Sequence, residues 1–469
     1  MNLQASFARY VYWPLAQKLK GEHAARALKD LSQSQWKSQE ELLSSQWQLV
    51  RETINKAVRE VPYYRRVCAD TGWDMNNKKF SYEDFLGFPK LDKETLQNNI
   101  KEFLNPHYAG RVTTGRTSGS TGLSLTLYYT SEHESYSEAG RWRAKNWWGV
   151  KPGSPQVAIW GRPYTGYKDR IAQQVKSYLM NSLMFSAFDL REEALVRIWK
   201  KISRFKPSVI YGYPSAIYTL AVYLKENRIV ADKLGIKVVI ITAESSTSIQ
   251  RDLIEEVFGC KTANEYGCSE TGGFVYECPE GSWHISSELT FMEFLDNNGS
   301  PVSSDEIGEL YVTHLRNDYM PLIRYRLGDI GGPLQGLCAC GRCLPLMNIS
   351  VAKERDFIVL SNGERHTSEI LVYITRAVLE KYPDAILHFR ALQKNAESLE
   401  VEIVPGSGDM DEALRYFRRL LSKQTKGLID IHIRTVQKLE REPTGKLRYF
   451  VSEVNQEPLA ANLSRKIEA

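Results

Sequence analysis

The chain has 469 residues, of which 42% are hydrophobic and 25% are charged, an ordinary globular composition that can bury a large core. Its 61 basic and 56 acidic residues give a formal net charge of only +5, so the composition does not favour nucleic acid as a partner. At about 150 residues per domain, this length suggests two to four domains.

Residues 1–20 predict an amphipathic helix that is broken near Pro14. Its apolar side would carry Phe7, Tyr10, Val11 and Trp13. The apolar run is too short for a signal peptide or a membrane span. Two interpretations stay open, packing against the core, which we favour, and contact with a membrane surface.

The chain contains seven cysteines and no secretion signal, which predicts a reducing, cytoplasmic location. Cysteines that cluster in such a compartment bind metal more often than they form disulfides.

Residues 1–105 are predicted to be mostly helical, including a helix that ends at Pro62. From about 110 to 295, short apolar strands alternate with helices. Strands are predicted at Val157–Trp160, Ser208–Tyr211, Val238–Thr242 and Thr262–Tyr266, and helices at Glu192–Arg204, Ser215–Glu226 and Ser248–Phe258. This alternation predicts right-handed βαβ crossovers and a largely parallel sheet.

Residues 290–335 predict turn-separated strands of an antiparallel or barrel-like unit. A boundary is expected near residues 350–356. Beyond it, strands are predicted near 356–360, 386–393, 398–404 and 430–436, and helices near 368–381 and 409–423. We therefore expect an α/β protein with a large N-terminal domain, residues 1–350, and a small mobile C-terminal α/β domain, residues 351–469.

A Ser/Thr/Gly-rich loop, 117-TSGSTG-122, leads into a predicted strand at Leu123–Tyr129. Glycine allows close backbone approach, and exposed N–H groups with hydroxyls can donate to phosphate oxygens. The loop lacks the GxxxxGK[ST] pattern of a Walker A loop. On its own it fits a phosphate cradle or an ordinary polar loop.

Three further motifs carry polar groups that suit a nucleotide. In 264-NEYGCSETGG-273, Tyr266 offers an aromatic face, Gly267 a tight turn and Glu270 a hard oxygen for Mg²⁺. In 324-RYRLGDIG-331, Asp329 is expected at a strand end, where a carboxylate can accept hydrogen bonds from ribose hydroxyls. In 441-REPTGKLRYF-450, a turn would present Lys446 to a developing negative charge.

Taken in order, these four motifs resemble those of the adenylate-forming superfamily of acyl-CoA synthetases and ligases, over nearly the whole chain. The segments 208-SVIYGYPSAIYTLA-221, PLIRYRLGDIG and CACGRCLP look more narrowly like the phenylacetate–CoA ligase family. The most similar branch is the one often associated with capsular-polysaccharide genes.

The resemblance implies a two-step reaction: a carboxylate attacks the α-phosphate of ATP, and a nucleophile, usually a thiol, then takes the acyl group. The loop would hold the β- and γ-phosphates through Thr117, Ser118, Gly119, Ser120, Thr121 and Gly122. Glu270 would bind Mg²⁺, Asp329 the ribose, and Lys446 would bridge the acid and the nucleotide. The other expected nucleotide-binding residues are Glu244, Asn264, Glu265, Tyr266, Gly267, Ser269 and Lys353.

The C-terminal domain would rotate between the two half-reactions about a hinge near Lys353. Two departures from the family pattern concern this machinery. The family's Gly-Arg pair at the hinge is replaced by Ala352-Lys353, and Leu123 stands where many relatives have a lysine. Arg116 or Arg326 is expected to supply the missing positive charge, and Arg326 is therefore a candidate catalytic residue.

Two short clusters, 278-CPEGSWH-284 and 338-CACGRC-343, predict a tetrahedral Zn²⁺ site. The expected ligands are Cys278, His284, Cys338 and Cys340, with Cys343 as a spare or substitute. No water-activating group is obvious nearby, so the metal would be structural. Packing of unpaired cysteines without zinc is the alternative.

The acid would bind near the ends of two predicted strands, where Tyr211, Tyr213 and Pro214 follow one and Gly161, Arg162 and Tyr164 the other. Arg162 beside aromatic residues would suit an anionic or carbohydrate acid better than a plain fatty acid. The acceptor is expected to be the thiol of CoA, with an amine or a carrier protein as the alternative. A non-catalytic nucleotide-binding scaffold is the third hypothesis, and a monomer or homodimer is expected.

Overall fold

The computed structural model describes residues 3–73, 80–116, 125–161, 167–304, 306–353, 357–441 and 447–454. The first part is helical, as predicted. Its elements are α1 (Leu3–Phe7), the π-turn η1 (Ala8–Tyr12), α2 (Trp13–Lys20), α3 (Ala24–Ser34), α4 (Gln39–Glu60), α5 (Pro62–Thr71), α6 (Tyr82–Leu86), α7 (Lys93–Asn98) and the 3₁₀ turn η2 (Ile100–Phe103).

The break expected at Pro14 is absent. Pro14 stands in the first turn of α2, and Tyr12 before it keeps helical backbone angles. Proline cannot donate the usual hydrogen bond to the preceding turn, and the wider π-turn η1 lies directly before it. The helix therefore continues through the proline instead of ending there.

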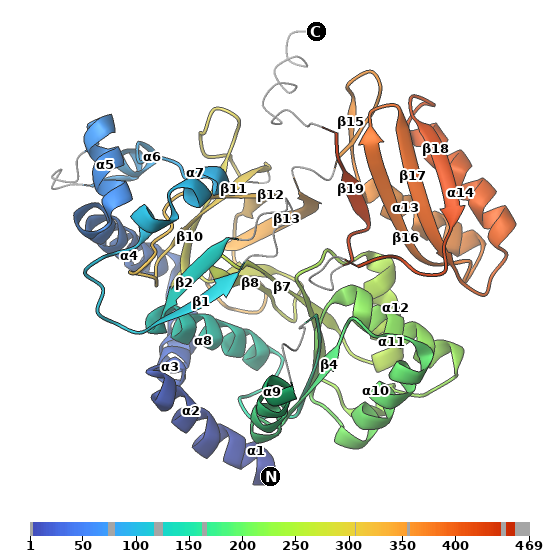
Figure 1. Ribbon diagram of the computed structural model, residues 1–469, viewed down its shortest axis with the longest axis horizontal. Helices are drawn as coiled ribbons and strands as arrows, with labels where there is room; N and C mark the ends of the chain where they lie inside the picture. Colours follow the sequence, from blue (N-terminus) through green and yellow to red (C-terminus); the bar gives the residue numbers. More distant parts are fainter. Residues whose placement is uncertain are drawn as a thin grey trace.

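One large sheet dominates the molecule (Figure 1). Its strands are β3 (Gln156–Trp160), β4 (Ser182–Ser186), β5 (Val209–Gly212), β6 (Val238–Thr242), β7 (Thr262–Cys268), β8 (Gly272–Glu277), β9 (Trp283–Ile285), β10 (Thr290–Leu295), β11 (Gly308–His314), β12 (Tyr325–Leu334) and β13 (Leu346–Lys353). They lie in the order β10-β11-β12-β13-β9-β8-β7-β6-β5-β3-β4.

The sheet is parallel from β4 to β7 and antiparallel from β7 to β10. The predicted parallel βαβ region is thus confirmed. The antiparallel strands that were expected in a barrel-like unit instead continue the same sheet. A separate hairpin, β1 (Val112–Arg116) with β2 (Thr126–Thr130), precedes the sheet in the chain.

Helices cover both faces of the parallel strands. They are α8 (Ser131–Trp147), α9 (Tyr167–Leu179), α10 (Glu192–Phe205), α11 (Pro214–Glu226), the 3₁₀ turn η3 (Asp232–Leu234) and α12 (Ser248–Phe258). In β6, Val239 and Ile241 pack with α10–α12, whereas Val238 and Ile240 pack with α8 and Trp13. All five β6 residues are buried because both faces are covered, which explains the continuous apolar run.

The C-terminal part forms a smaller α/β unit with its own apolar core. Its elements are β14 (Phe357–Val359), β15 (Arg365–Thr367), α13 (Glu369–Lys381), β16 (Ile386–Asn395), β17 (Ser398–Pro405), α14 (Met410–Gln424), β18 (Asp430–Thr435) and β19 (Phe450–Ser452). The order β18-β17-β16-β19 makes a four-stranded sheet. The α/β fold class, with a large N-terminal and a small C-terminal part, is confirmed.

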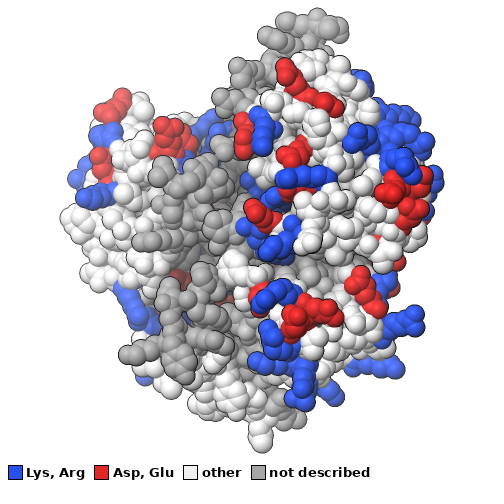
Figure 2. Space-filling model, turned by 45° about the vertical axis from the view of Figure 1, so that its right-hand side comes forward, with Lys and Arg blue, Asp and Glu red and all other residues white. Residues whose placement is uncertain are grey.

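Basic and acidic side chains lie next to one another on the face that carries this C-terminal unit (Figure 2). Several of them form exposed ion pairs, such as Lys426 with Glu364 and Arg415 with Glu412. Such interspersed charges fit the low net charge of the chain and give this face no field of a single sign.

Arg324 is a buried charge that joins the helical N-terminal part to the large sheet. Its guanidinium pairs with Glu293 of β10, where the shortest N–O distance is 2.9 Å, and both side chains are at most 1% exposed. It also donates to the carbonyl oxygen of Phe88 at 2.7 Å. The buried guanidinium therefore has one partner in the large sheet, Glu293, and one in the helical N-terminal part, Phe88.

Replacing Arg324 with leucine should lower the free energy of unfolding by about 3–5 kcal/mol, because it leaves the Glu293 carboxylate buried without its partner. Urea titration of the purified variant would measure the loss. The double variant Arg324→Leu/Glu293→Leu should recover part of it, and a single variant as stable as wild type would contradict the prediction.

Candidate active site and metal centre

Two of the predicted motifs meet near the C-terminal end of β7, inside the large sheet. The Tyr266 hydroxyl in β7 donates to Asp329 Oδ2 in β12 at 2.8 Å. The Tyr325 hydroxyl in β12 donates to Glu270 Oε1 at 3.1 Å. Residues that are about 60 positions apart in the sequence are thus brought into one polar cluster.

The β1–β2 hairpin flanks this cluster. Arg116 and Thr126 are paired across the hairpin, so the Ser/Thr/Gly loop connects its two strands. The Tyr129 hydroxyl in β2 donates to the carbonyl oxygen of Ser269 at 2.6 Å, directly beside Glu270. The hairpin that carries the loop therefore contacts the residue directly before the acidic residue that was predicted to bind Mg²⁺.

Several predictions fall outside the described residues. These are Thr117, Ser118, Gly119, Ser120, Thr121, Gly122 and Leu123 in the loop, Arg162 and Tyr164 after β3, and Lys446. The side chains of Arg116 and Lys353 are also outside the description, although their backbones are within β1 and β13.

Gly267 lies inside β7 and not in the tight turn that was expected there. A Cβ atom at this position would come within 2.3 Å of the carbonyl oxygen of Gly272 on β8. Since no side chain can be accommodated at that distance, glycine is needed here for the close approach of two strands. The turn itself follows Cys268, after the end of β7.

Asp329 is the fifth residue of the ten-residue strand β12, and not at a strand end as expected. Its partner across the ladder is Lys353 of β13, and the register shifts just after this pair. A β-bulge of this kind commonly re-aims side chains at sites. The predicted ribose-binding carboxylate and the predicted hinge are thus neighbours in the sheet.

The other nucleotide-site candidates on β7 have partners on both sides of the strand. The Asn264 amide donates to Glu277 Oε2 at 2.6 Å, and Glu265 Oε1 accepts from the Tyr211 hydroxyl at 2.9 Å. Burial raises the pKa of the Cys268 thiol, which therefore stays neutral. This fits the expectation that Cys268 has no nucleophilic role.

Arg326 is paired away from this cluster, and its role as a catalytic residue stays a prediction. Its guanidinium makes two hydrogen bonds to the Glu309 carboxylate on β11, at 2.6 and 3.0 Å. Successive residues of a strand point to opposite faces, and Tyr325 already points to Glu270. Arg326 therefore lines a separate surface pocket with Lys90, Asp92 and Tyr311.

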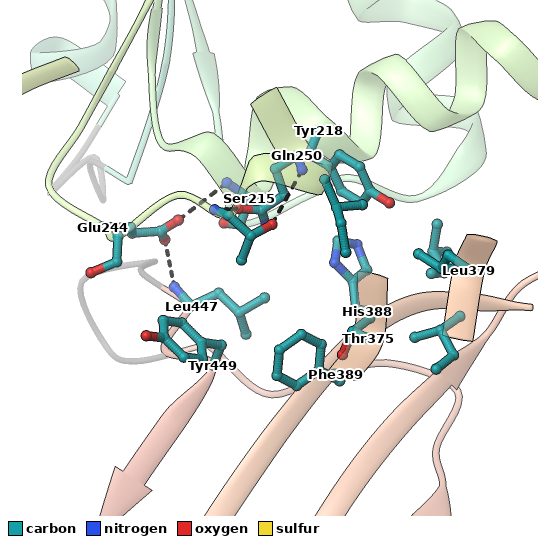
Figure 3. A pocket seen from close by; sticks show the side chains of 15 residues that line it. Ser215, Tyr218, Glu244, Gln250, Thr375, Leu379, His388, Phe389, Leu447 and Tyr449 are labelled. Carbon is teal, nitrogen blue, oxygen red and sulfur yellow. Dashed lines mark hydrogen bonds between the residues drawn. The ribbon is translucent and has the colours of Figure 1, made fainter. Parts of the chain in front are cut away.

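Glu244 lies where the C-terminal unit contacts the large sheet (Figure 3). It is the second residue after β6, and Ala243 before it has a left-handed backbone with φ of 69°. Its carboxylate accepts hydrogen bonds from the backbone N–H of Leu447 and of Ser215, the latter at 3.2 Å. Burial raises the pKa of Glu244 in spite of these bonds.

Arg441 reaches the same place from the C-terminal side. Its guanidinium donates to the Ser215 hydroxyl at 2.8 Å and lies 3.8 Å from Glu244 Oε1. The described residues on both sides of 442–446 are thus held at one carboxylate. Glu244, predicted to bind nucleotide, has a clear structural partner in the residue that follows Lys446.

A pocket opens beside this contact, between α11, the loop after β6 and the C-terminal sheet (Figure 3). His388 of β16 points into it, 3.3 Å from the Thr219 hydroxyl and edge-on to the Tyr218 ring. Burial, followed by the charge of Arg441, lowers the pKa of His388 to about 4. The contact between the two parts is therefore made by a neutral imidazole.

The four predicted zinc ligands lie together. One donor atom from each of Cys278, His284, Cys338 and Cys340 is within 4.8 Å of every other. The Sγ atoms of Cys278 and Cys338 are 3.6 Å apart, and Cys340 Sγ is 3.3 Å from His284 Nε2. Ligands on a tetrahedral Zn²⁺ with bonds of about 2.0–2.3 Å stand at roughly these separations.

The strands explain how residues so distant in sequence meet. His284 of β9 is paired with Leu346 of β13 on one side and with Tyr276 of β8 on the other. Cys278 follows β8, and Cys338 and Cys340 precede β13, so every ligand stands at the same end of three neighbouring strands. Cys343 stays outside the cluster, with its Sγ 4.0 Å from the carbonyl oxygen of Gly341.

Sequence reasoning missed Ser215, Arg441 and Tyr325 as residues that position the site. Ser215 and Arg441 are 226 positions apart, so nothing local marks them as partners. Tyr325 was inside a quoted motif, and its position four residues before the predicted ribose-binding Asp329, on the same face of a strand, was the available signal.

No protein-family model matches the chain. Among curated proteins, it is 28% identical to Protein CapK of Staphylococcus aureus over 294 residues, which are 62% of each chain and thus less than two thirds of that protein. It is 25% identical to a phenylacetate-coenzyme A ligase of Thermus thermophilus over 370 residues, which cover 77% of this chain and 80% of that one.

The chain is thus similar in sequence to phenylacetate–CoA ligases and to Protein CapK. Among solved structures, this ligase-like chain is similar to 2-hydroxyisobutyryl-CoA ligase in the postadenylation state, with a TM-score of 0.69 at 18% identity over 91% of this chain and 92% of that one. That likeness confirms the adenylate-forming fold that the motifs predicted.

Proposed function

We propose that this ligase-like protein activates a carboxylic acid with ATP and passes the acyl group to a thiol. In the first step an oxygen of the acid attacks the α-phosphorus, the bond to the β-phosphate oxygen breaks, and pyrophosphate leaves. In the second step a thiolate attacks the acyl carbonyl, the bond to AMP breaks, and AMP leaves with the bonding electrons. The thiol proton is lost to solvent.

The observation that carries the proposal is the cluster of Tyr266, Glu270 and Asp329 beside the β1–β2 hairpin, whose strands the Ser/Thr/Gly loop connects. Asp329 would accept hydrogen bonds from ribose, and Tyr266 would offer its ring to the base. Glu270 would hold Mg²⁺, which supplies positive charge to the phosphate oxygens. The loop residues 117–122 would donate to those oxygens.

Lys446 would stabilise the negative charge that develops as acid and α-phosphate meet. The anchoring of Leu447 and Arg441 at Glu244 supports this role, because Glu244 follows β6 at the same edge as Glu270. Rotation of the C-terminal unit about residues near Lys353 would then withdraw Lys446 before the thiol enters.

CoA is the thiol we favour, since several similar proteins are named acid–CoA ligases. An amine acceptor is the second candidate. A segment of 136 residues is 28% identical to indoleacetate–lysine synthetase of Pseudomonas savastanoi, although it covers only 31% of that protein. Product analysis with CoA and with amines would distinguish the two.

The acid is proposed to carry polar substituents, because charged and aromatic side chains gather between α8 and the ends of β3, β5 and β7. Trp160 stacks on Tyr211 with ring centroids 5.6 Å apart, and Lys145 Nζ lies 5.1 Å from the Tyr211 ring. Arg141 stands one helical turn before Lys145, and the Glu265 carboxylate is its main Coulombic partner. An aromatic platform with donors and acceptors suits a hydroxylated or sugar-like acid.

Replacing Arg141 with leucine should lower kcat/KM for hydroxylated or uronic acids by about tenfold or more relative to aryl acids. Leucine cannot donate a hydrogen bond, so a polar group of the bound acid would be left without a partner. Pyrophosphate release across a panel of acids would measure the ratio. An unchanged preference would show that Arg141 does not contact the acid.

The function itself is tested by acid-dependent pyrophosphate release from ATP and by the variant Lys446→Ala. We expect this variant to lose adenylation by about a hundredfold or more, while it still converts a supplied acyl-adenylate and CoA to thioester. Full adenylation activity in the variant would overturn the assignment of Lys446. Binding of ATP or AMP in calorimetry without pyrophosphate release for any acid would favour the non-catalytic scaffold hypothesis instead.

A further inference from the structure

The helix formed by α1, η1 and α2 turns its apolar side to solvent. Leu3, Phe7, Val11, Leu15 and Leu19 follow one another at intervals of four residues, and they are 87%, 44%, 51%, 53% and 74% exposed. Tyr10, between Phe7 and Val11, is 65% exposed. We call these six side chains the apolar ridge.

The opposite side of the same helix is fixed to the protein. Ala8, Trp13 and Gln17 are buried, and Trp13 Nε1 donates to Glu138 Oε1 of α8 at 2.7 Å. The Gln17 side chain accepts from the backbone N–H of Ala25 at 3.0 Å. The buried residues and these hydrogen bonds therefore hold one side of the helix, and its larger apolar side is left open.

The π-turn keeps the ridge on one side. In an α-helix, residues four apart overshoot a full turn, so a stripe at this spacing gradually winds around the helix. The wider turn Ala8–Tyr12 needs more residues per rotation and partly reverses that drift. A geometry that is uncommon in helices thus aligns Leu3 and Phe7 with Leu15 and Leu19.

The ridge corrects the interpretation that we favoured from the sequence. Phe7, Tyr10 and Val11 do not pack in the core, and only Trp13 of the predicted apolar side does. Exposed apolar area of this length is uncommon in soluble proteins and marks a surface that binds something. Figure 1 shows the helix along the outer edge of the molecule, away from the C-terminal unit.

The charges beside the apolar ridge indicate which kind of partner binds to it. Residues 3–20 contain no Asp or Glu, and they contain Arg9, Lys18 and Lys20. Arg111 adds a further exposed cation. It lies at the end of the helix, where its guanidinium donates to the carbonyl oxygen of Leu19 at 3.3 Å. Two copies of the ridge packed against each other would bring these cations together without a counter-charge.

We propose that the apolar ridge lies in the interface of a lipid bilayer whose headgroups are anionic. The six apolar side chains would enter the boundary between headgroups and acyl chains, and Arg9, Lys18 and Arg111 would contact lipid phosphates. No helix among the described residues is long and apolar enough to cross a membrane, so the contact is peripheral.

Sedimentation with phosphatidylcholine vesicles, with and without phosphatidylglycerol, tests the proposal on the full chain. Wild type should bind the anionic vesicles and lose binding as salt is added. The variant Phe7→Gln/Leu15→Gln/Leu19→Gln keeps good helix formers and should lower the partition coefficient by about a hundredfold or more. Adenylation without vesicles should not change.

The matched control replaces three exposed apolar residues elsewhere, Val196→Gln/Ile307→Gln/Tyr373→Gln, and should bind vesicles like wild type. The proposal is overturned if wild type does not bind anionic vesicles, or if the ridge variant binds as well as the control. Light scattering tests for a dimer. If wild type and the control variant are dimers that do not bind vesicles, and the ridge variant is a monomer, then the ridge binds a second copy of the chain and the proposal is overturned.

Discussion

Replacing Glu270 with glutamine is expected to lower kcat/KM for adenylation by about 100- to 1,000-fold, because the negative charge proposed to hold Mg²⁺ is lost. Glutamine has nearly the same shape and can still accept the hydrogen bond from Tyr325. The loss would therefore reflect charge and not packing. Pyrophosphate release measured at several Mg²⁺ concentrations would quantify it.

Two companion variants make this result specific. Tyr325→Phe removes the hydroxyl that orients Glu270 and should cost no more than about tenfold, as expected for a residue that acts through another. Glu397→Gln removes an exposed carboxylate of the C-terminal unit and should leave the rate unchanged. A Glu270→Gln variant as active as wild type at limiting Mg²⁺ would remove Glu270 from the proposed metal site.

Loss of metal from the cysteine–histidine cluster is the second large effect that we expect. Metal analysis of the purified protein should find close to one Zn²⁺ per chain. Cys340→Ser should lose most of it and should lower the midpoint of thermal unfolding by roughly 5 °C or more, because the cluster ties three strands together. Treatment with a strong chelator should have the same effect on wild type.

The loop provides its own control, since Cys343→Ser makes the same substitution three residues away, outside the group of four. This variant should retain zinc and the wild-type unfolding midpoint. Absence of zinc from protein grown with zinc, or equal losses in Cys340→Ser and Cys343→Ser, would rule out the proposed ligand set.

Where the sequence carried local periodic signals, it predicted the fold well. The helix predicted at Ser248–Phe258 is α12, which begins at a capping box on Thr247 and ends at Gly259 in a left-handed conformation. The strand predicted at Val238–Thr242 is β6, which is apolar on both faces. Helix caps and buried strands are determined by residues that are close together in the sequence, so each can be predicted from one segment alone.

Contacts across the fold could not be predicted in this way. Arg326 alternates with Tyr325 along β12, and the sequence does not say which of the two faces Glu270. Its actual partner, Glu309, lies on another strand. The apolar ridge shows the same limit, because helical periodicity finds an apolar side and does not reveal whether core or solvent lies against it.

The shared anchor at Glu244 has a further consequence. Because Arg441 and Leu447 are both held by one carboxylate, the short segment between them is tethered at its two ends. Both contacts involve the same atom, Glu244 Oε1. A substitution at Glu244 would therefore be expected to release Arg441 and Leu447 together, on either side of the lysine that is proposed to be catalytic.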